Sequence, residues 1–323
     1  MDGLRITTLK HNKVKKTKIK LGIIGVGKWG MNFVKTISEI DNIILTAIST
    51  RNLLIKRKFE ENYVIYSNWK ELVNSEQIDG VIITTPPNSH FEILNYCIEK
   101  KLPALVEKPL TIQLSEAKDL LAYCQNNPSL VLVDHIYLYE KNFREIKKIS
   151  KNNNRIISIN TMSGSSGPFR NDVRALWDWG SHDIAMCIDL MNSIPKVLSA
   201  RYAKKNSKGE IVEAKLLFQD NCEANILIGN LFEKKIRNFK VELEDLKITY
   251  EPFKKNLAKE YIDKKLNHDK GKTFNIYRNY ELPMKTILRE FAYLISRKEK
   301  VYSDLELGFK TIQTLENIKK KLA

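Results

Sequence analysis

The sequence predicts an α/β protein in which a doubly wound parallel sheet is followed by an α+β domain with an open, mostly antiparallel sheet. Between residues 19 and 134, short apolar runs alternate with segments of helical periodicity, a pattern typical of parallel βαβ units. Beyond residue 195, long β-rich segments are joined by short turns, which favours antiparallel pairing. A glycine-rich turn between the first strand and the first helix supports the same fold class.

Apolar runs bounded by turn residues predict the strands of the parallel sheet, and apolar residues at helical spacing predict its helices. Ser89 and Glu92 have the spacing of a capping box, which predicts that a helix begins at this point. The strands are expected at residues 19–24, 42–49, 79–84, 103–106 and 130–134, and the helices at 29–40, from Trp69, at 90–101 and at 114–125.

The second half of the chain mixes helices with longer strands. From Pro283 the helical pattern returns, and a last helix is expected after Ser303-Asp304. The earlier helices are expected at 140–150 and 174–191, and the strands at 155–163, 196–204, 210–218, 222–231 and 238–250.

Composition bounds the class of protein. The 323 residues are 43% hydrophobic and 28% charged, an ordinary globular balance that excludes a mostly disordered or fibrous chain. The net charge of +16, from 54 basic and 38 acidic residues, is compatible with nucleic acid, an anionic membrane surface or an anionic small molecule, or with a merely lysine-rich surface. Because no helix-turn-helix, zinc or aromatic-rich motif is present, we expect no nucleic-acid partner, and because no apolar run is long enough to span a bilayer, we expect no membrane partner.

Four cysteines, Cys97, Cys124, Cys187 and Cys222, are widely spaced and form no CxxC pair. This pattern indicates neither a disulfide framework nor a zinc site, and we expect no metal. Reduced thiols are typical of a cytoplasmic protein, and no apolar run approaches the length of a membrane span. We therefore expect a cytoplasmic protein.

The strongest local signal is the segment Gly25-Val-Gly27-Lys28-Trp29-Gly30, which follows a predicted strand and opens a predicted helix. In this setting Gly25 permits the tight turn, and Gly27 lets the backbone approach a pyrophosphate at the helix N-terminus. Gly30 permits close packing of helix on strand. Out of this setting three glycines would be an ordinary turn, but here they predict a dinucleotide-binding Rossmann domain.

We therefore divide the chain into a basic flexible lead-in (1–18), a Rossmann domain (19–138) and an α+β domain for substrate binding and oligomerisation (139–323). The helices from about residue 284 are expected to pack back on the Rossmann domain. A lysine-rich stretch, 253–273, is weakly patterned and is expected to be an exposed excursion.

The end of the second strand should set the choice between NAD and NADP. An NAD site commonly places an acidic residue there, but none occurs before Glu60. Ser49, Thr50 and Arg51 could instead hold a 2′-phosphate, with Arg51 as the cation. We expect NAD(P), with NADP slightly favoured; the alternative is a solvated loop, with NAD held by other contacts.

Loops at the carboxyl ends of parallel strands line the ligand crevice of such a sheet. Thr85, Pro86, Asn88 and His90 follow the third main strand. Asn88 and His90 could contact cofactor or substrate. The alternative for His90 is a residue of the first helical turn that is satisfied locally.

Two further segments carry groups suited to proton transfer. Glu107 and Lys108 end the next strand, which would place the lysine over the nicotinamide, although lysine is abundant enough for a surface role. Asp178 and His182 are four residues apart on a predicted helix and share one face. That spacing suits an acid–base pair and is also that of a common structural pair.

Together these segments resemble the glucose–fructose oxidoreductase/inositol dehydrogenase (Gfo/Idh/MocA) family over residues 18–323. The resemblance is carried by Gly25-x-Gly27-x-x-Gly30, Thr85-Pro86-x-x-x-His90, Glu107-Lys108-Pro109, Asp178-x-Gly180-x-His182 and the closing phrase Tyr302-Ser-Asp304-Leu-Glu-Leu-Gly308.

The resemblance implies hydride transfer between NAD(P) and a sugar, polyol or nucleotide-sugar carbon, in a homodimer or homotetramer. It implies that Lys108 and His182 are the catalytic pair, that Asp178 completes the site, and that the Lys108–Pro109 bond is cis. The expected cofactor-binding set is Gly25, Gly27, Lys28, Trp29, Gly30, Ser49, Thr50, Arg51, Thr85, Pro86, Asn88, His90, Glu107 and Lys108. Asp178 and His182 would also contact the substrate, and Arg170 and Arg174 could hold its phosphate or carboxylate or lie in solvent.

One departure from the family pattern concerns the last motif. Many members place an aspartate three residues after the histidine, where this chain has Ala185, and here Asp183 follows His182 directly. This variant looks more like members that act on nucleotide sugars. The alternatives are a non-catalytic dinucleotide-binding regulator of the same fold and an NAD-assisted glycosidase.

Overall fold

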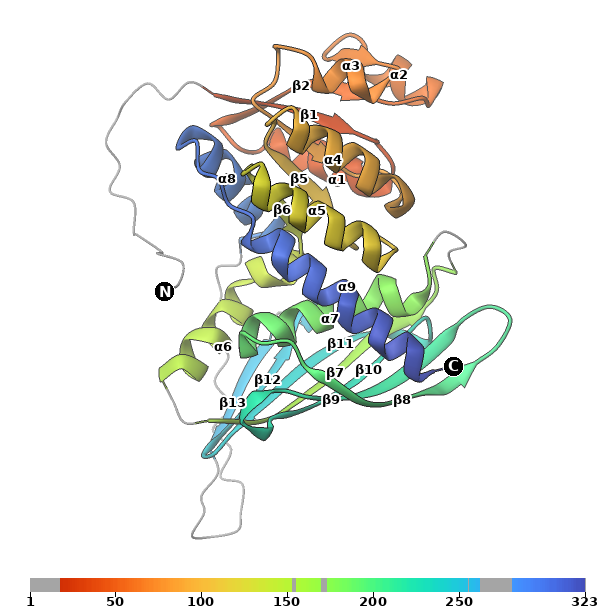
Figure 1. Ribbon diagram of the computed structural model, residues 1–323, viewed down its shortest axis with the longest axis vertical. Coiled ribbons are helices and arrows are strands. Elements are labelled where there is room, and N and C mark those ends of the chain that lie inside the picture. Colours follow the sequence, from red (N-terminus) through yellow and green to blue (C-terminus); the bar gives the residue numbers. More distant parts are fainter. Residues whose placement is uncertain (1–17, 153–154, 170–172, 255, 262–280, 323) are drawn as a thin grey trace.

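The computed structural model describes residues 18–152, 155–169, 173–254, 256–261 and 281–322. Two sheets organise the described chain, a six-stranded parallel sheet and a seven-stranded mixed sheet. Figure 1 shows the parallel sheet in the upper half of the molecule and the mixed sheet in the lower half. This architecture confirms the predicted fold class. No described helix combines the length and the apolar character that crossing a bilayer requires.

The N-terminal sheet is parallel throughout and is covered on both faces. Ile82 points into one core, with Phe33 and Ile287, while its neighbours Val81 and Ile83 point into the other. Burial on both faces explains why these strands read as continuous apolar runs. In spatial order the strands are β3 (Val64–Tyr66), β2 (Ile43–Ser49), β1 (Ile19–Ile24), β4 (Gly80–Ile83), β5 (Ala104–Glu107) and β6 (Val131–Asp134).

The helices of this half lie between successive strands. The sequence did not predict α2 or the short strand β3. Only one residue of α2, Phe59, is buried, while Leu53 and Leu54 are exposed, so its apolar residues do not mark a buried face. The helices are α1 (Lys28–Ile37), α2 (Leu53–Phe59), α3 (Trp69–Val73), α4 (His90–Glu99) and α5 (Leu114–Asn126).

The predicted capping box at Ser89 is wrong. A 3-10 turn, η1 (Pro87–Ser89), precedes α4, and Ser89 makes no side-chain cap. Its hydroxyl lies 2.8 Å from the carbonyl oxygen of Pro86 and 2.8 Å from Thr85 Oγ1. Pro87 starts a tight turn that brings the serine back onto its own loop, where closer partners compete with the helix amides.

The C-terminal sheet is antiparallel except where β10 pairs in parallel with β7. The prediction of one strand over 238–250 is wrong, because the chain reverses at Glu244-Asp245 and Val241 pairs with Ile248. In spatial order the strands are β13 (Asn256–Tyr261), β12 (Leu246–Glu251), β11 (Leu231–Leu243), β7 (Ile156–Ser166), β10 (Glu223–Gly229), β9 (Glu210–Leu217) and β8 (Lys196–Lys205).

Strand β13 falls inside the stretch expected to be an exposed excursion, so that expectation is wrong for residues 256–261. The rest of the excursion beyond residue 261, and the predicted lead-in apart from Lys18, lie outside the described residues.

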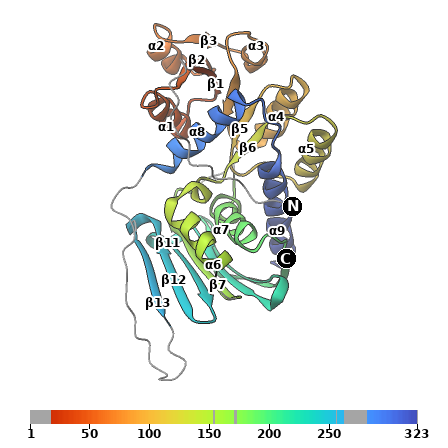
Figure 2. The same cartoon turned by 90° about the vertical axis from the view of Figure 1, so that its left-hand side faces the viewer.

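Helices join the two sheets. Figure 2 shows α6 (Lys141–Asn152) and α7 (Ala175–Met191) on one face of the mixed sheet. Helix α8 (Pro283–Ser296) returns to the N-terminal sheet and packs on α1 and β1. The last helix, α9 (Ser303–Lys321), contacts α5 and β6 of one half and α7 and β8 of the other. One contiguous apolar core therefore runs through both halves.

Candidate active site

The glycine turn has the shape of a phosphate cradle. Gly25 has a φ of +88°, a value that strains any side-chain-bearing residue. A Cβ on Gly30 would lie 2.5 Å from the carbonyl oxygen of Gly25, whereas a Cβ on Gly27 would have no heavy atom within 4 Å. The backbone is thus tight where helix meets strand and open at Gly27, which fits a dinucleotide pyrophosphate at the start of α1.

The segment after β2 lies beside this turn, since Gly25 donates its amide to the carbonyl of Ser49 at 3.0 Å. Ser49 and Thr50 are buried, and Arg51 is exposed. Asn52 caps α2 by accepting hydrogen bonds from the amides of Leu54 and Ile55. The exposed cation at the end of β2 is therefore Arg51. Lys28 and Trp29, in the first turn of α1, are exposed as well.

His90 holds the loop after β4 in place, and its ring does not face the crevice as a free ligand-binding group. Thr85 is half-buried, and Pro86 and Asn88 are exposed. His90 is fully buried, with Nδ1 2.9 Å from the carbonyl oxygen of Pro109 and Nε2 2.9 Å from that of Thr85. Burial lowers its pKa. Because both ring nitrogens face backbone carbonyls, His90 links two loops of the crevice, in line with the locally satisfied alternative.

Lys108 follows β5 and reaches α7. Its Nζ donates to Asp178 Oδ1 at 2.6 Å and to the Asp178 carbonyl oxygen at 2.8 Å. The two side chains are 10% and 18% exposed, so the ion pair is largely shielded from water but still reachable. The Lys108–Pro109 bond is cis, which confirms the expectation drawn from the family resemblance.

His182 lies one turn further along α7 than Asp178 and packs edge-on against Tyr137, with ring centres 4.9 Å apart at 85°. Its Nδ1 is buried and has no hydrogen-bond partner among the described residues. Desolvation, reinforced by Lys108, Arg237 and His135, holds the pKa of His182 well below 6.5. The structure thus places a carboxylate–lysine pair one helical turn before a neutral imidazole.

Sequence reasoning missed Asp134 and His135, two buried residues at the end of β6, whereas Glu107 was already in the expected cofactor-binding set. Glu107 and Asp134 are paired in register on β5 and β6, and their carboxyl groups are hydrogen-bonded. Burial, with Asp134 as a like charge, raises the pKa of Glu107 well above its usual range, and burial raises the pKa of Asp134 to about 6. His135 is also buried. The signal was a polar pair, Asp134-His135, directly after an apolar strand.

The two candidate substrate arginines differ in status. Arg174, the N-cap residue of α7, donates to Glu210 Oε2 at 2.7 Å and to the Tyr202 hydroxyl at 2.9 Å. The Glu210 side chain is only 7% exposed, so this ion pair fastens α7 to β9. Arg170 lies outside the described residues.

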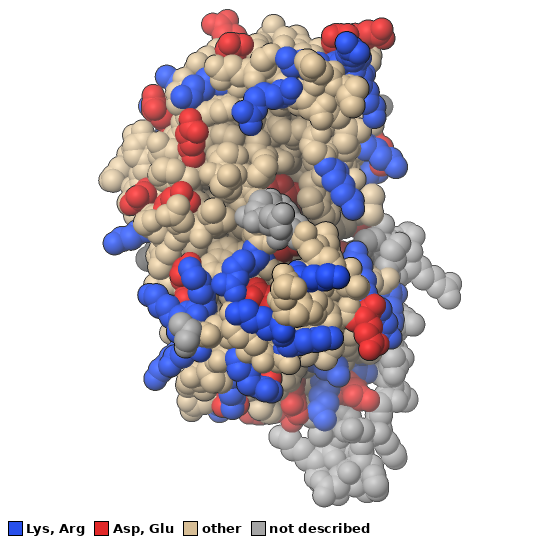
Figure 3. All heavy atoms as spheres, turned by 90° about the vertical axis from the view of Figure 1, so that its right-hand side faces the viewer, with Lys and Arg blue, Asp and Glu red and all other residues tan. Residues whose placement is uncertain are grey.

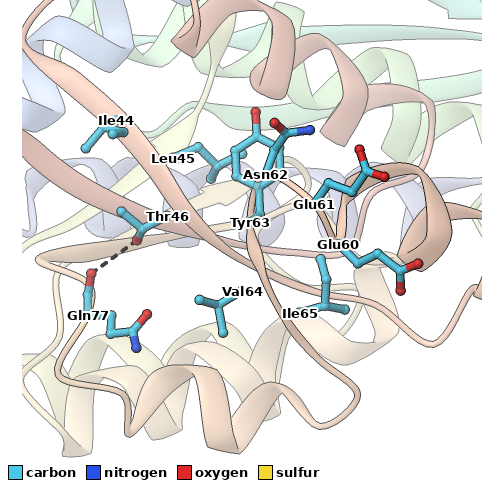
Figure 4. A pocket seen from close by; sticks show the side chains of 10 residues that line it. All are labelled: Ile44, Leu45, Thr46, Glu60, Glu61, Asn62, Tyr63, Val64, Ile65 and Gln77. Carbon is cyan, nitrogen blue, oxygen red and sulfur yellow. Dashed lines mark hydrogen bonds between the residues drawn. The ribbon is translucent and has the colours of Figure 1, made fainter.

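The surface hollow in Figure 4 lies away from all of these residues. It opens where β2 begins and where the segment before β4 passes, and the hydroxyl of Thr46 donates to the carbonyl oxygen of Gln77 at 3.1 Å across it. This is the amino-terminal edge of the strands, opposite the edge that carries the glycine turn and Lys108, so we assign it no part in the site.

The structure therefore combines a Rossmann-type parallel sheet and a glycine cradle with a lysine, a carboxylate and a neutral imidazole that meet at the carboxyl edge of the sheet. Residues 19–135 match the model of the oxidoreductase family with an NAD-binding Rossmann fold, Gfo/Idh/MocA. The match covers the part of the chain that holds the glycine turn, His90 and Lys108, and it is to the family that the sequence motifs resemble.

Two curated relatives are inositol dehydrogenases by name. The chain is 29% identical over 222 residues to the scyllo-inositol 2-dehydrogenase (NADP(+)) of Bacillus subtilis (strain 168), covering 64% of this chain and 61% of that protein. It is 24% identical over 137 residues to the myo-inositol 2-dehydrogenase of Thermotoga maritima, covering 42% and 41%. These alignments thus span less than two thirds of the relatives' own lengths.

Solved structures cover nearly the whole chain. A crystal structure of a protein from Magnetospirillum magnetotacticum MS-1 has 29% identity and a TM-score of 0.83, covering 93% of this chain and 99% of the other. The UDP-N-acetylglucosamine 3-dehydrogenase of Acidithiobacillus ferrooxidans has a TM-score of 0.81 at 16% identity, covering 94% and 98%. The second likeness is one of fold.

Proposed function

We propose that this protein is an NAD(P)-dependent dehydrogenase or reductase that moves a hydride between nicotinamide and a CH–OH carbon of a sugar, polyol or nucleotide sugar. One observation carries the proposal. The ion pair of Lys108 with Asp178, 2.6 Å long, joins the carboxyl edge of the parallel sheet to the helix that bears His182. A cation and a base thereby stand together beside the glycine cradle.

Nicotinamide, when bound, supplies the hydride acceptor or donor. The ammonium group of Lys108 has three donors, of which two are used by the carboxylate and the carbonyl oxygen of Asp178. The third is available to a substrate oxygen. Because the negative charge on that oxygen grows toward the transition state, a fixed cation there lowers the barrier.

His182 takes the hydroxyl proton as the hydride leaves. Its lowered pKa keeps the imidazole neutral at pH 7, which is the form able to accept a proton. In the reverse direction, the reduction of a carbonyl, the protonated ring would return the same proton to the substrate oxygen. Asp178 orients Lys108 and keeps the buried ammonium charge paired.

For the cofactor we propose a preference for NADP. Arg51 is exposed at the end of β2, and no acidic residue stands between it and Glu60 to hold the ribose hydroxyls of NAD. The Bacillus subtilis relative carries NADP(+) in its name, which supports the same direction.

The substrate class follows the relatives' names, inositol 2-dehydrogenase and UDP-N-acetylglucosamine 3-dehydrogenase, which share a ring carbon bearing a secondary hydroxyl. Within that class we favour nucleotide sugars, because Asp183 directly follows His182.

We further propose that the chain divides near residue 138 into a Rossmann domain and a substrate domain. We also propose that the protein forms a homodimer or homotetramer.

The deciding experiment is a panel of cyclic polyols, sugars and nucleotide sugars, each offered with NAD and with NADP and followed by nicotinamide absorbance. We expect turnover with at least one ring alcohol, faster with NADP. Tight cofactor binding without turnover on any compound would instead favour a regulator, and cleavage of an aryl glycoside without net cofactor reduction would favour a glycosidase. Light scattering of the same sample reports the oligomeric state.

A further inference from the structure

A buried ion pair lies directly behind His182. Asp183, the next residue of α7, is fully buried, and Arg237 on β11 is only 3% exposed. Their Oδ2 and Nη1 atoms are 3.3 Å apart. Asp183 Oδ2 also accepts a hydrogen bond from the hydroxyl of Ser163, the register partner of Arg237 on β7. Two neighbouring strands therefore hold the residue that follows the proposed base.

The same guanidinium group also packs over two aromatic rings, one of which touches His182. Its Cζ lies 4.0 Å from the ring centre of Tyr137 and 5.7 Å from that of Trp179. Tyr137 in turn packs edge-on against the imidazole at 4.9 Å. His182, Asp183, Arg237 and Tyr137 thus form a closed circuit of contacts drawn from α7, β11 and the 3-10 turn η2 (Ile136–Tyr139).

Stability alone does not account for this pair. Burying two charges is costly, and replacing such a pair by apolar residues of similar volume is often neutral or stabilising. The Arg237 nitrogens have no hydrogen-bond partner among the described residues, and neither does Asp183 Oδ1. The contacts that hold Arg237 are instead its ion pair with Asp183 and its packing over the ring of Tyr137.

We propose that Arg237, with Asp183 and Tyr137, is a positioning unit that fixes the ring of His182. The inference rests on the proposed function, in which His182 accepts the substrate proton. Asp183 holds the helix turn that carries His182, Tyr137 limits the rotation of the ring, and Arg237 ties the two together. Arg237 touches no reacting atom in this scheme.

The charges around His182 agree with this role. Burial is the largest cause of its lowered pKa, and the next causes are Lys108, Arg237 and His135. A proton on His182 would place a third positive charge between Lys108 and Arg237. The charged and titratable groups that face it are Lys108, His135 and Tyr137 from the N-terminal half, Arg237 from the sheet, and Asp178 and Asp183 from α7 itself.

The first test needs no substrate. The imidazole signals of the five histidines are followed by NMR against pH in the full chain, with His182→Gln to assign the signal of interest. We expect Arg237→Met to move the protonation midpoint of His182 to higher pH. Arg237→Lys, which keeps the charge, should leave the midpoint near the wild-type value. Arg201→Met, at a 71% exposed side chain on β8, is the matched control and should move nothing.

Arg237→Met leaves Asp183 as an unpaired buried carboxylate, so a second variant is needed. Arg237→Met/Asp183→Asn removes both charges and keeps the fold testable. Because the repulsion from Arg237 is gone, its His182 midpoint should also rise, by less than in the single variant. A midpoint equal to the wild-type value in both Met-containing variants would overturn the proposal.

The second test uses any substrate found with the panel. Arg237→Met should lower kcat by about 10- to 100-fold, the scale of a misplaced catalytic group, while KM and cofactor affinity change little. Arg237→Lys should recover part of the loss. Unchanged kcat in Arg237→Met would overturn the positioning role while leaving the proposed oxidoreductase intact. Absence of turnover in the wild type, together with the expected NMR shifts, would instead reject the proposed function alone.

Discussion

Lys108 has the most direct chemical role proposed for any residue of this chain. Its ammonium group is held by both the side chain and the main chain of Asp178, so its position is set by the helix that also carries His182. A lysine fixed in this way can be both shielded and aimed, whereas a free surface lysine would lose its favourable energy to water and to its own rotamers.

Lys108→Met should lower kcat by about 100- to 1000-fold, the cost of removing one donor aimed at a developing oxyanion. Cofactor affinity should hardly change, because the glycine cradle is untouched. Steady-state kinetics and nicotinamide fluorescence titration measure the two quantities. The control is Lys215→Met, because Lys215 on β9 forms an exposed ion pair with Glu223. Full turnover by Lys108→Met would remove this lysine from the mechanism.

Arg51 should decide the choice of cofactor. Arg51→Glu places a negative charge where a 2′-phosphate would lie, and hydrogen bonds to charged groups contribute about 1.5–3 kcal/mol. We expect the Kd for NADP to rise by roughly 10- to 150-fold, the conversion of that energy, and the Kd for NAD to stay the same or fall. Arg201→Glu is the charge-matched control. Equal weakening of both cofactors would contradict the assignment.

How far the sequence predicts the site depends on where its parts lie in the chain. The glycine turn, Lys108 and the Asp178–His182 pair belong to short motifs, so residue spacing alone predicts their chemistry. Spacing does not predict the Lys108–Asp178 ion pair, because the two residues are 70 positions apart. Arg237 likewise meets Asp183 only through the pairing of β11 with β7. Contacts between distant segments are set by tertiary packing, which residue spacing does not record.

At the scale of elements, strands and helices with a buried face were predicted and those without one were not. The four-residue strand β4 is buried on both faces and was predicted, whereas the seven-residue helix α2 buries Phe59 alone and was missed. The continuous β-rich run across β11 and β12 hid a hairpin, because Glu244-Asp245 is a short turn with no glycine or proline. The Ser89 pattern was misread because proline at residue 87 imposes its own turn.

The first turn of α9 carries a titratable contact. The Tyr139 hydroxyl donates to Asp304 Oδ2 at 3.2 Å, and burial, with Glu290 as a like charge, raises the pKa of Asp304 to about 7. An unfolded aspartate has a pKa of about 3.9. Between these values the folded state binds a proton that the unfolded state does not, so the free energy of unfolding falls as pH rises from about 4 to 7.

Asp304→Asn removes this titration. We expect the variant to gain stability relative to the wild type between pH 5 and pH 8, by about 1–3 kcal/mol. Urea unfolding of both proteins at the two pH values measures the difference, and groups common to both cancel. A difference that does not change with pH would show that Asp304 is ionised throughout.

At the scale of the whole molecule, α9 is the element that spans both sheets. Gly308 lies where this helix crosses the loop after Lys108, and a Cβ there would come within 3.0 Å of Leu110 Cδ2 and 3.4 Å of Val133 Cγ2. The close approach lets one helix pack on both halves. Any displacement of Leu110 would be passed to Lys108, two residues before it in the same loop.

Gly308→Val should therefore lower stability and turnover together. Overpacking of a close contact costs about 1–3 kcal/mol, which should appear as a lower Tm, and kcat should fall while the Kd of the cofactor changes less. Thermal unfolding and steady-state kinetics on the same samples test this. Lys320→Val, on an exposed position of the same helix, should change neither. A lower Tm with an unchanged kcat would show that the packing of α9 does not affect the position of Lys108.

The excess positive charge also belongs to this scale. Figure 3 shows Lys and Arg side chains gathered mainly over the lower half of one face, where the mixed sheet and the end of α9 lie, and more sparsely over the upper half. On this face the basic side chains of the described residues are thus more numerous over the C-terminal half, in keeping with a chain that has 54 Lys and Arg against 38 Asp and Glu.

The pairing of Lys108 with Asp178 has a consequence for how such a protein can change over generations. Arg51, proposed to choose the cofactor, follows a strand of the parallel sheet, whereas Arg237 lies on the mixed sheet and Asp183 on helix α7. Mutations near Arg51 could therefore change the cofactor preference without altering the groups around His182, and the reverse. The Lys108–Asp178 ion pair lacks this independence, because a change on either side of it alters the same contact.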